Sequence, residues 1–364
     1  MMYKIIVNLK TDPYPIFIGR GVSEKLPRFL ADKDIGNYAV VITQRKIVSL
    51  HKGRIGCLLK GIPYRIVYVP QGETAKSQEW AFRIIETLLS ENKGVLKKRI
   101  FLVCLGGGVV GDVGGFIASI YKRGIPFIQV PTTLLAQVDA SIGGKTAINV
   151  RQAKNMVGTF YQPQAVFIDP EFITTLPKRE LRQGFAEVIK YAAIKDKDLF
   201  TFLDKNSSEI QKLVPRYLEK IITRCAQIKA EIVSCDEKEK KGLRTILNFG
   251  HTIGHALEAA LCYRRDFHHG EGVALGMICA AGISVKLGLC SQSVAEKLAD
   301  LIKKYSLPVT ARFDTQKVLA SLTYDKKFVR GSIRMVLLTF VGKTRVCSRI
   351  NLADIKKSLL KIKQ

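Results

Sequence analysis

Histidines cluster in the second half of the chain at spacings that suit a metal ion. His251 and His255, in NFGHTIGHALEAA, lie four residues apart on a helical pattern, so both imidazoles leave one helix face. A third histidine, His268 or His269, begins the helical segment HHGEGVALGM and would come from an adjacent helix. A catalytic zinc with two imidazole ligands needs a third ligand, usually a carboxylate, and an open position for substrate. Glu187, inside the mostly apolar GFAEVIKYAAI, is the best candidate for that carboxylate. The alternative, ordinary core or surface histidines, does not explain the clustering.

A glycine-rich turn in the first half has the geometry that binds a pyrophosphate. GGGVVGDVGGFIASIY (106–121) follows the strand-like RIFLVCL and continues as an apolar helix. Glycines let the backbone approach phosphate oxygens, and the helix N-terminus stabilises their charge. Gly106, Gly108 and Gly111 fit GxGxxG, although glycines in such a run also pack a helix closely against a sheet. The turn follows a third or fourth strand, so an ordinary dinucleotide-binding domain is the wrong template.

A second glycine-rich segment, DASIGGKTAI (139–148), ends like a nucleotide-triphosphate P-loop. Asp139 stands where that motif needs glycine, and the segment follows the start of a helix instead of a strand. An ATPase is therefore excluded. Lys145 remains a good anion-binding lysine.

The elements that would position these groups form an α/β domain followed by a helical one. Helical spacing in SQEWAFRIIETLLSEN (77–92), with Ser77 as N-cap, separates two strand-like runs and completes a βαβ step. Such alternation predicts a parallel sheet. The short apolar, β-branched runs predicted to be strands are YAVVIT (38–43), YRIVYV (64–69), RIFLVCL (99–105), PFIQV (126–130) and AVFID (165–169).

From about Thr174 onward the strand patterns fade, and long helical patterns predict an all-α domain that binds the metal. The domains are expected at 1–173, for an α/β nucleotide-binding domain, and 174–364, for the helical domain, joined near TTLPKREL. No internal repeat or low-complexity tract is found. The helical patterns are ELRQGFAEVIKYAAI, RYLEKIITRCAQIKAEIV, GVALGMICAAGISVKLG and SVAEKLADLIKKY.

Composition indicates a globular, cytoplasmic protein. The chain has 364 residues, is 47% hydrophobic, and contains neither a long apolar run nor a signal-peptide pattern at its start. Its eight cysteines lack a CxxC pair and are expected to be buried, reduced thiols. His51 stands alone and is expected to be structural.

A net charge of +27 is the unusual bulk property. A basic excess can mark a nucleic-acid binder, but the charges are dispersed and no nucleic-acid-binding motif is present. A general compositional bias is the simpler explanation. An anionic substrate would account for a few of the charges.

Six segments together resemble the 3-dehydroquinate synthases, a family of sugar phosphate cyclases, over essentially the whole chain. A lone glycine motif could mislead, but six motifs in the same order and spacing are specific. The segments are PQGETAKS (70–77), GGGVVGDVGGFIASIYKRGIPFIQVPTTLLAQVDASIGGKTAIN (106–149), KNMVGTFYQP (154–163), LPKRELRQGFAEVIKYA (176–192), GLRTILNFGHTIGHALEA (242–259) and HGEGVALGM (269–277).

The resemblance implies an N-terminal NAD domain, a C-terminal helical domain and an active site in the cleft between them. It places the metal ligands at Glu187, His251 and His269. Helical spacing alone would have made His255 a ligand, whereas the family pattern gives His255 a role in substrate binding and proton transfer. His268 receives no task.

The same resemblance implies a set of NAD contacts and a set of substrate contacts. The NAD contacts are Gln71, Gly72, Glu73, Thr74, Ala75, Lys76, Gly108, Val109, Val110, Gly111, Asp112, Thr132, Thr133, Lys145, Lys154, Phe172, Ile173, Thr174 and Thr175. The substrate contacts are Arg123, Asp139, Lys145, Asn155, Lys190, Lys229, Arg244, Asn248, His255 and one of Lys326 and Lys327; Lys145, Lys190, Arg244, Asn248 and His255 among them form the catalytic group.

The implied reaction is that of a phosphate-eliminating lyase. Its substrate, 3-deoxy-D-arabino-heptulosonate 7-phosphate, carries a phosphate and a carboxylate, which paired Arg and Lys side chains suit. Transient oxidation by NAD is followed by phosphate elimination, return of the hydride, and intramolecular aldol closure to 3-dehydroquinate. A divalent metal, zinc or else cobalt, assists the oxidation. The resemblance also implies a homodimer.

Two segments depart from the family pattern. VITQRKI has Gln44 near the position where many relatives carry Asn or Asp for the adenosine ribose, and DEKEKKGLR is one residue longer than usual, which affects the Lys229 assignment. The rivals are another sugar phosphate cyclase, such as 2-deoxy-scyllo-inosose synthase, and a metal-dependent polyol dehydrogenase, which typically has Asp where Glu187 stands.

Overall fold

The computed structural model of the chain divides into two compact units. It describes residues 2–92, 98–150, 153–261, 267–323, 328–329 and 332–364. The N-terminal unit comprises Met1–Pro177 and Lys229–Lys238, and the C-terminal unit comprises Lys178–Ile228 and Glu239–Gln364. From the sequence alone the boundary was expected between residues 173 and 174, and no pattern indicated that Lys229–Lys238 belongs to the first unit.

A seven-stranded sheet forms the centre of the N-terminal unit, in the order β1-β2-β9-β6-β5-β3-β4. All neighbouring strands are parallel except the antiparallel pair β1 and β2. The five predicted strands are confirmed as β3, β4, β5, β6 and β9, whereas β1 and β2 were not predicted. The bounds are β1 (Tyr3–Val7), β2 (Tyr14–Ile18), β3 (Tyr38–Thr43), β4 (Tyr64–Tyr68), β5 (Ile100–Gly106), β6 (Phe127–Pro131) and β9 (Ala165–Ile168).

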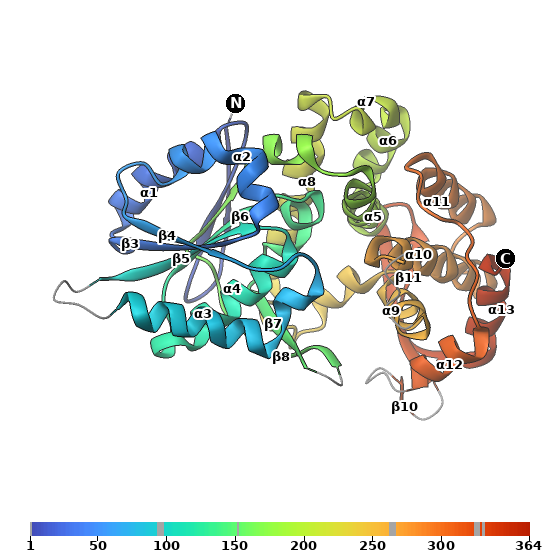
Figure 1. Ribbon diagram of the computed structural model, residues 1–364. Helices are drawn as coiled ribbons and strands as arrows, with labels where there is room; N and C mark the ends of the chain where they lie inside the picture. The colour runs from blue at the N-terminus through green and yellow to red at the C-terminus, as the bar shows by residue number, and fades with distance from the viewer. Residues whose placement is uncertain (1, 93–97, 151–152, 262–266, 324–327, 330–331) are drawn as a thin grey trace. The chain divides into compact units, whose positions relative to one another are not determined.

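Helices cover both faces of this sheet, as Figure 1 shows. Because side chains alternate along a strand, Ala39 and Val41 of β3 pack in the core under α1 and α2, while Val40 and Ile42 pack in the core under α3 and α4. The predicted helix is confirmed as α3, and Ser77 accepts a hydrogen bond from its first turn. The four helices are α1 (Leu26–Lys33), α2 (Arg45–Leu58), α3 (Gln78–Glu91) and α4 (Gly108–Ile120).

Smaller elements of the N-terminal unit carry many of the predicted site residues. An antiparallel hairpin begins within the second glycine-rich segment, for which the sequence predicted only an anion-binding turn. These elements are the turns η1 (Val22–Lys25), η2 (Glu73–Lys76), η3 (Tyr121–Arg123), η4 (Ala136–Ala140) and η5 (Pro170–Thr175), and the hairpin strands β7 (Lys145–Val150) and β8 (Ala153–Phe160).

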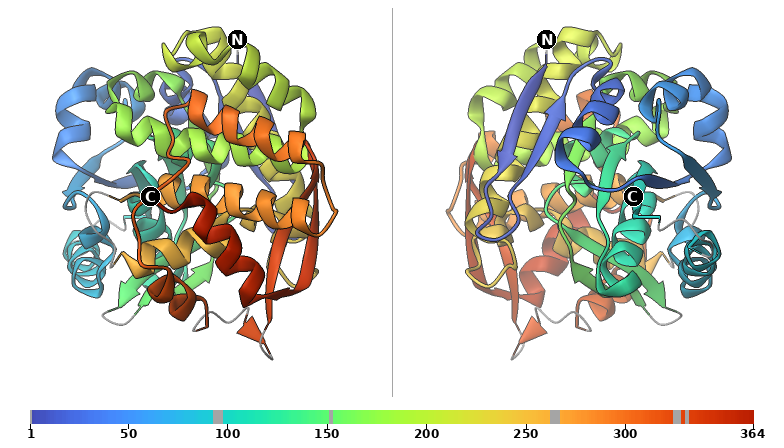
Figure 2. Two further views of the ribbon diagram at one scale, coloured as in Figure 1. Left: turned by 90° about the vertical axis from the view of Figure 1, so that its right-hand side faces the viewer. Right: turned by 90° about the vertical axis from the view of Figure 1, so that its left-hand side faces the viewer.

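The C-terminal unit is mainly helical, as predicted, with α10 in contact with α5, α9, α11 and α13. In the left view of Figure 2, the red α13 lies across the orange α10. The four long helical patterns are confirmed as α5, α8, α10 and α11. The helices are α5 (Lys178–Lys195), α6 (Lys197–Lys205), α7 (Ser207–Gln211), α8 (Pro215–Cys235), η6 (Leu243–Asn248), α9 (His251–Ala260), α10 (His269–Lys286), α11 (Gln292–Lys304), α12 (Thr315–Thr323) and α13 (Leu352–Ile362).

The C-terminal unit also contains a three-stranded antiparallel sheet, which the prediction of an all-α unit did not include. Its central strand buries residues on both faces, from Met335 through Leu338, so it lacks the alternation that marks a half-exposed strand. The strands are β10 (Phe328–Val329), β11 (Ser332–Phe340) and β12 (Lys343–Asn351).

The expectation of buried cysteines is right for Cys104, Cys225 and Cys279 and wrong for Cys57 and Cys235, which are exposed. Burial raises the pKa of the Cys279 thiol to about 12, so this thiol stays protonated and unreactive. The remaining positions are intermediate or, for residue 262, outside the described residues. None of the helices described is long and apolar enough to cross a membrane.

Candidate active site

Three side chains of the C-terminal unit that the family resemblance implies as metal ligands lie close together: Glu187 from α5, His251 from α9 and His269 from α10. One ligand atom of each lies within 4.8 Å of the others. Glu187 Oε1 is 3.4 Å from His251 Nε2 and 3.7 Å from His269 Nε2. Two ligands held at about 2.0–2.1 Å by a tetrahedral zinc lie about 3.3 Å apart. The three groups therefore have the spacing and the chemistry of a zinc site.

The carboxylate of Glu187 is buried in a way that calls for a cation. Glu187 is 1% exposed, and neither of its oxygens accepts a hydrogen bond of regular geometry. Lys190, one turn later on α5 and equally buried, has its ammonium against this carboxylate. Burying a carboxylate is costly unless positive groups lie close to it, and a metal ion here would add to the charge that Lys190 supplies.

Charges around Glu187 set the protonation of the cluster. Burial disfavours its charged form, but Lys190 and His251 outweigh burial and hold the pKa of the Glu187 carboxyl well below its usual range. Burial lowers the pKa of His251, with Glu187 opposing it. Burial also acts to lower the pKa of His269, yet Glu187 and Glu258 together raise it to about 10. These shifts favour the charged form of the Glu187 carboxylate, with Lys190 as the nearest positive group.

Close contact between α9 and α10 brings the two histidines to Glu187. Gly250, whose φ of 80° favours glycine, ends the preceding turn so that α9 begins at His251. A Cβ built on Gly254 would lie 2.9 Å from the carbonyl group of Gly272, and one on Gly276 only 1.9 Å from the Gly250 carbonyl oxygen. Only glycines at these positions allow the helix backbones to approach so closely.

Glu187, His251 and His269 are called the triad below, and the neighbouring histidines lie outside it. The exposed His255 has its ring centroid 5.4 Å from that of His251 and 5.8 Å from that of His269. It belongs to a second group of possible ligands, with Glu258 and His269, instead of to the triad. The sequence reasoning missed Glu258, although it lies seven residues after His251 and thus on the same helix face. His268 precedes α10 and is in neither group.

Further predicted substrate residues of the C-terminal unit lie on η6, which contacts α5. Arg244 is 2% exposed, and its Nε is 3.4 Å from a carboxylate oxygen of Glu239. Asn248 ends η6 and is half-buried. Lys326 and Lys327 lie outside the described residues.

In the N-terminal unit, the turn after β5 has the predicted form: β5 ends at Gly106 and α4 begins at Gly108. The first amides of a helix have no partner within it, so they are available to a phosphate. The alternative role of the glycines also applies, because a Cβ on Gly111 would lie 2.8 Å from Gln129 and one on Gly114 would lie 2.2 Å from Cys104. The run therefore combines a turn with free helix N-terminal amides and close helix–sheet packing.

Lys76 links three of the predicted segments. Its ammonium donates to Asp112 Oδ2 at 2.6 Å and to the side chain of Asn155, joining η2 to α4 and β8. Burial raises the pKa of Asp112, while Lys76 opposes that shift. Glu73 accepts from Asn149 of β7 at 2.7 Å. The remaining predicted residues of this segment are Gln71, Gly72 and Thr74, which are exposed, and Ala75, which is buried.

Predicted anion-binding and substrate residues of the N-terminal unit lie on several turns. Asp139 of η4 is contacted by Lys229, which donates to its backbone oxygen at 2.8 Å and to its carboxylate. Arg123 and Lys145 are exposed, and Lys154 is half-buried. Lys229 thus lies beside Asp139, although the longer loop at residues 236–244, which affects its assignment, follows it in the chain. Thr132 and Thr133 directly follow β6, and Val109 and Val110 lie in the first turn of α4.

The segment η5 contains the last predicted NAD contacts. Phe172 and Ile173 are buried, whereas Thr174 and Thr175 are exposed. His51, which lies at a kink in α2, is 7% exposed; its Nε2 is 2.9 Å from Thr175 Oγ1 and its ring packs edge-on against Phe172. The expectation that His51 is structural agrees with these contacts. The side-chain amide nitrogen of Gln44 donates a hydrogen bond to the Pro70 carbonyl oxygen, so this amide has a partner within the protein.

The contacts of His51 predict a pH-dependent stability. Burial, assisted by the charge of Arg54, lowers the pKa of His51 below its ordinary value of 6.5. The unfolded chain therefore binds a proton at His51 more readily than the folded protein does. The stabilisation is complete above the His51 pKa of the unfolded chain and is lost as pH falls through the His51 pKa of the folded protein. When pH is lowered from about 7.5 to about 5.5, we expect the melting temperature of His51→Gln to decrease less than that of the unaltered protein. The other histidines are the same in both proteins, so equal slopes would contradict this role of His51.

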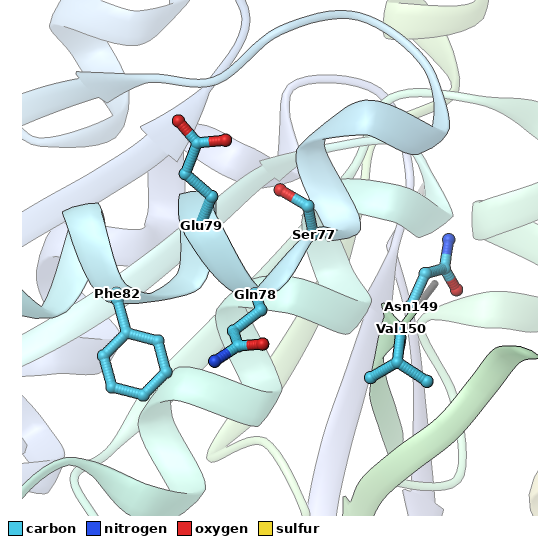
Figure 3. A pocket seen from close by; sticks show the side chains of 6 residues that line it. All are labelled: Ser77, Gln78, Glu79, Phe82, Asn149 and Val150. Carbon is cyan, nitrogen blue, oxygen red and sulfur yellow. The ribbon is translucent and has the colours of Figure 1, made fainter. Parts of the chain in front are cut away.

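A groove in the N-terminal unit lies where the start of α3 approaches the end of β7 (Figure 3). Its lining includes the exposed ring of Phe82, which is 53% exposed. The lining residues are Ser77, Gln78, Glu79, Phe82, Asn149 and Val150. None of them is a predicted site residue, so the groove adjoins the predicted NAD segment without being part of it.

Known proteins share this architecture. The fold defines a class of proteins in which an α/β unit with a glycine-rich turn is followed by a mainly helical unit, which in this chain holds the possible metal ligands Glu187, His251 and His269. A solved 2-epi-5-epi-valiolone synthase from Streptomyces hygroscopicus subsp. jinggangensis, with NAD⁺ and Zn²⁺ bound, is 26% identical with a TM-score of 0.85 and covers 97% of this chain and 98% of its own. A solved 2-deoxy-scyllo-inosose synthase, complexed with carbaglucose-6-phosphate, NAD⁺ and Co²⁺, is 27% identical with a TM-score of 0.86 and covers 99% and 100%.

Sequence comparison gives the family. The model for the N-terminal part of 3-dehydroquinate synthase matches residues 66–183, and that for the C-terminal part matches residues 184–328. The 3-dehydroquinate synthase of Thermodesulfovibrio yellowstonii is 43% identical over 98% of this chain and 99% of its own length. The chain belongs to the 3-dehydroquinate synthase family. The family, the fold class and the enzyme class that were predicted from the sequence are confirmed.

Proposed function

We propose that the chain converts 3-deoxy-D-arabino-heptulosonate 7-phosphate to 3-dehydroquinate and phosphate, with NAD and one divalent metal ion as cofactors. The observation that carries this function is the buried Glu187 with the Nε2 atoms of His251 and His269 beside it. Relatives that are 43% and 41% identical over nearly the whole chain are named 3-dehydroquinate synthase. The chain is accordingly a carbon–oxygen lyase that eliminates phosphate.

Glu187, His251 and His269 would hold the ion. One carboxylate and two imidazoles suit zinc and also cobalt, and three protein ligands leave a position for substrate. The two solved neighbours contain Zn²⁺ and Co²⁺ respectively. Zinc is the metal that we propose for this chain.

Residues of the N-terminal unit would hold NAD. The first turn of α4 offers amide groups to the pyrophosphate, while Lys76 keeps η2, Asp112 and Asn155 together. We also assign to NAD binding the predicted contacts Thr132 and Thr133, which follow β6, and residues 172–175 of η5. When bound, NAD exchanges a hydride with the substrate and the divalent ion polarises the substrate oxygens.

The chain's own side chains would bind and orient the substrate. Lys229, held against Asp139, and the buried Arg244 suit the phosphate and carboxylate through charge-assisted hydrogen bonds. We assign both side chains to fixing the charge and geometry of the substrate. The exposed imidazole of His255 is the group that we assign to moving a proton. The remaining assigned contacts are Arg123, Lys145, Asn155, Lys190, Asn248 and one of Lys326 and Lys327.

Phosphate release without net NADH tests this function. The purified protein, loaded with zinc, is incubated with the heptulosonate phosphate and NAD, and phosphate and NADH absorbance are followed together. We expect phosphate to accumulate to many equivalents per chain while NADH does not accumulate, because the hydride is returned in each turnover. No phosphate release from this substrate would contradict the proposal.

Another sugar phosphate cyclase is the second candidate, because two such enzymes share the fold. The same assay with glucose 6-phosphate, whose carba analogue is bound in one of those structures, separates the candidates. Phosphate release from glucose 6-phosphate alone would favour a 2-deoxy-scyllo-inosose synthase. Net NADH formation from a polyol would favour a dehydrogenase.

The cellular setting is proposed from the family resemblance. We assign the chain to the cytoplasm, as a homodimer with a small phosphorylated substrate and without a nucleic-acid or membrane partner. Dispersed charge and the absence of nucleic-acid-binding motifs in the sequence support this assignment. Light scattering of the purified protein tests the dimer, and retention on DNA without turnover would favour a nucleic-acid binder.

A further inference from the structure

Glu258 contacts the side of His269 that faces away from the Glu187 carboxylate. The ring's Nδ1 is 2.8 Å from Glu258 Oε1, whereas its Nε2 is directed to Glu187 at 3.7 Å. Glu258 has an exposed side-chain fraction of only 14%. The two nitrogens of one imidazole are therefore directed to two different carboxylates.

The other histidine of the triad has the same arrangement with a different acceptor. His251 Nδ1 lies 3.2 Å from the Phe249 carbonyl oxygen, and its Nε2 lies 3.4 Å from Glu187. In both histidines, an acceptor at Nδ1 favours the tautomer that carries its hydrogen there and leaves the Nε2 lone pair for a metal ion. For His251 that acceptor is backbone, but for His269 it is a side chain that can be changed.

Helix packing places Glu258 where this contact is made. Glu258 lies on α9, two turns after His251, and α9 packs closely against α10 through Gly254 and Gly272. A Cβ on Gly272 would lie 3.4 Å from Glu258 Oε1, so the carboxylate lies beside the helix that carries His269. The same close contact that brings the ligands together thus also brings the carboxylate to Nδ1.

We propose that Glu258 is a positioning residue that fixes the tautomer and orientation of His269 for metal binding. The proposal rests on the proposed metal site and adds a role for a residue outside the triad. Carboxylate partners of ligating histidines typically contribute about 10- to 100-fold in metal affinity. Glu258→Ala removes both the acceptor and its charge, whereas Glu258→Gln keeps an oxygen that can accept from Nδ1.

Cobalt binding to the metal-free protein tests the role without relying on activity. Co²⁺ is titrated into the unaltered protein, Glu258→Ala and Glu258→Gln, and the dissociation constant, stoichiometry and visible absorption spectrum are measured. We expect Glu258→Ala to bind about 10- to 100-fold more weakly with an altered spectrum, and Glu258→Gln to recover part of the affinity and the original spectrum. The melting temperature of each metal-free variant reports whether it folds.

Glu271→Gln is the matched control, because Glu271 is also near the start of α10 but accepts from the His268 backbone amide at 2.8 Å. It should bind Co²⁺ like the unaltered protein. Equal affinity and spectrum in folded Glu258→Ala would overturn the role of Glu258 alone. Two ions per chain, reduced to one in Glu258→Ala, would instead make Glu258 a ligand with His255 and overturn the positioning role. Failure of the unaltered protein to bind Co²⁺ would contradict the proposed metal site itself.

Discussion

Replacing Glu187 with glutamine is expected to remove the bound metal ion and to lower phosphate release by about 10³-fold, which equals about 4 kcal/mol of transition-state stabilisation. Glutamine has nearly the shape of glutamate but no charge, so it cannot oppose the positive charges that surround it. Lys190 would also keep its buried ammonium without the carboxylate that it contacts. Metal content per chain and the rate of phosphate release measure the two effects.

Glu180→Gln provides the control for this substitution, since Glu180 lies two turns earlier on the same helix and accepts a hydrogen bond from Gln183 at 2.9 Å. That variant should retain its metal and most of its activity. A folded Glu187→Gln protein with one tightly bound ion per chain would show that Glu187 is not a ligand. Reduced stability alone cannot account for metal loss if the variant's melting temperature stays close to that of the metal-free parent.

Gly276→Ala is expected to have the largest effect on stability. The new Cβ would lie 1.9 Å from the Gly250 carbonyl oxygen and 2.9 Å from the Gly254 amide nitrogen, both of them backbone atoms of or next to α9. One of the two helices must move, at a cost of about 1–3 kcal/mol. The movement would also displace His251 from Glu187, so we expect a melting temperature lowered on the order of 5 °C and weaker Co²⁺ binding.

The control lies on the same helix. A Cβ on Gly282 would meet only the Ser358 hydroxyl, at 3.2 Å, and that side chain can rotate away. Gly282→Ala should therefore have a small effect of either sign, because alanine also favours a helix by about 1 kcal/mol. Equal melting temperatures for Gly276→Ala and the unaltered protein would contradict the packing that we assign to α9 and α10.

Much of the fold could be predicted because its main elements have strong local patterns. The strand from Tyr38 to Thr43 ends in four consecutive β-branched residues, and α3 combines helical spacing with the Ser77 N-cap. The hairpin β7–β8 could not be predicted in the same way, because its first strand starts within a glycine-rich turn. The association of Lys229–Lys238 with the first unit depends on contacts distant in sequence, such as that of Lys229 with Asp139, which no local pattern reports.

The candidate site shows the same division between local and distant information. Spacing of four residues correctly places His251 and His255 on one helix, but the choice between His255 and His269 depends on how α10 packs against α9. The family resemblance supplied that choice, and its residue roles stay predictions. Glu258 was missed because a carboxylate beside a histidine becomes recognisable only once the two helices are placed together.

Anomalous diffraction at the zinc absorption edge, from crystals of the zinc-loaded protein, tests the account most directly. We predict one strong anomalous peak per chain, at about 2.0–2.2 Å from a carboxylate oxygen of Glu187 and from Nε2 of both His251 and His269. A fully loaded crystal with its only strong peak elsewhere, or with a peak that one of these three side chains does not contact, would contradict the account.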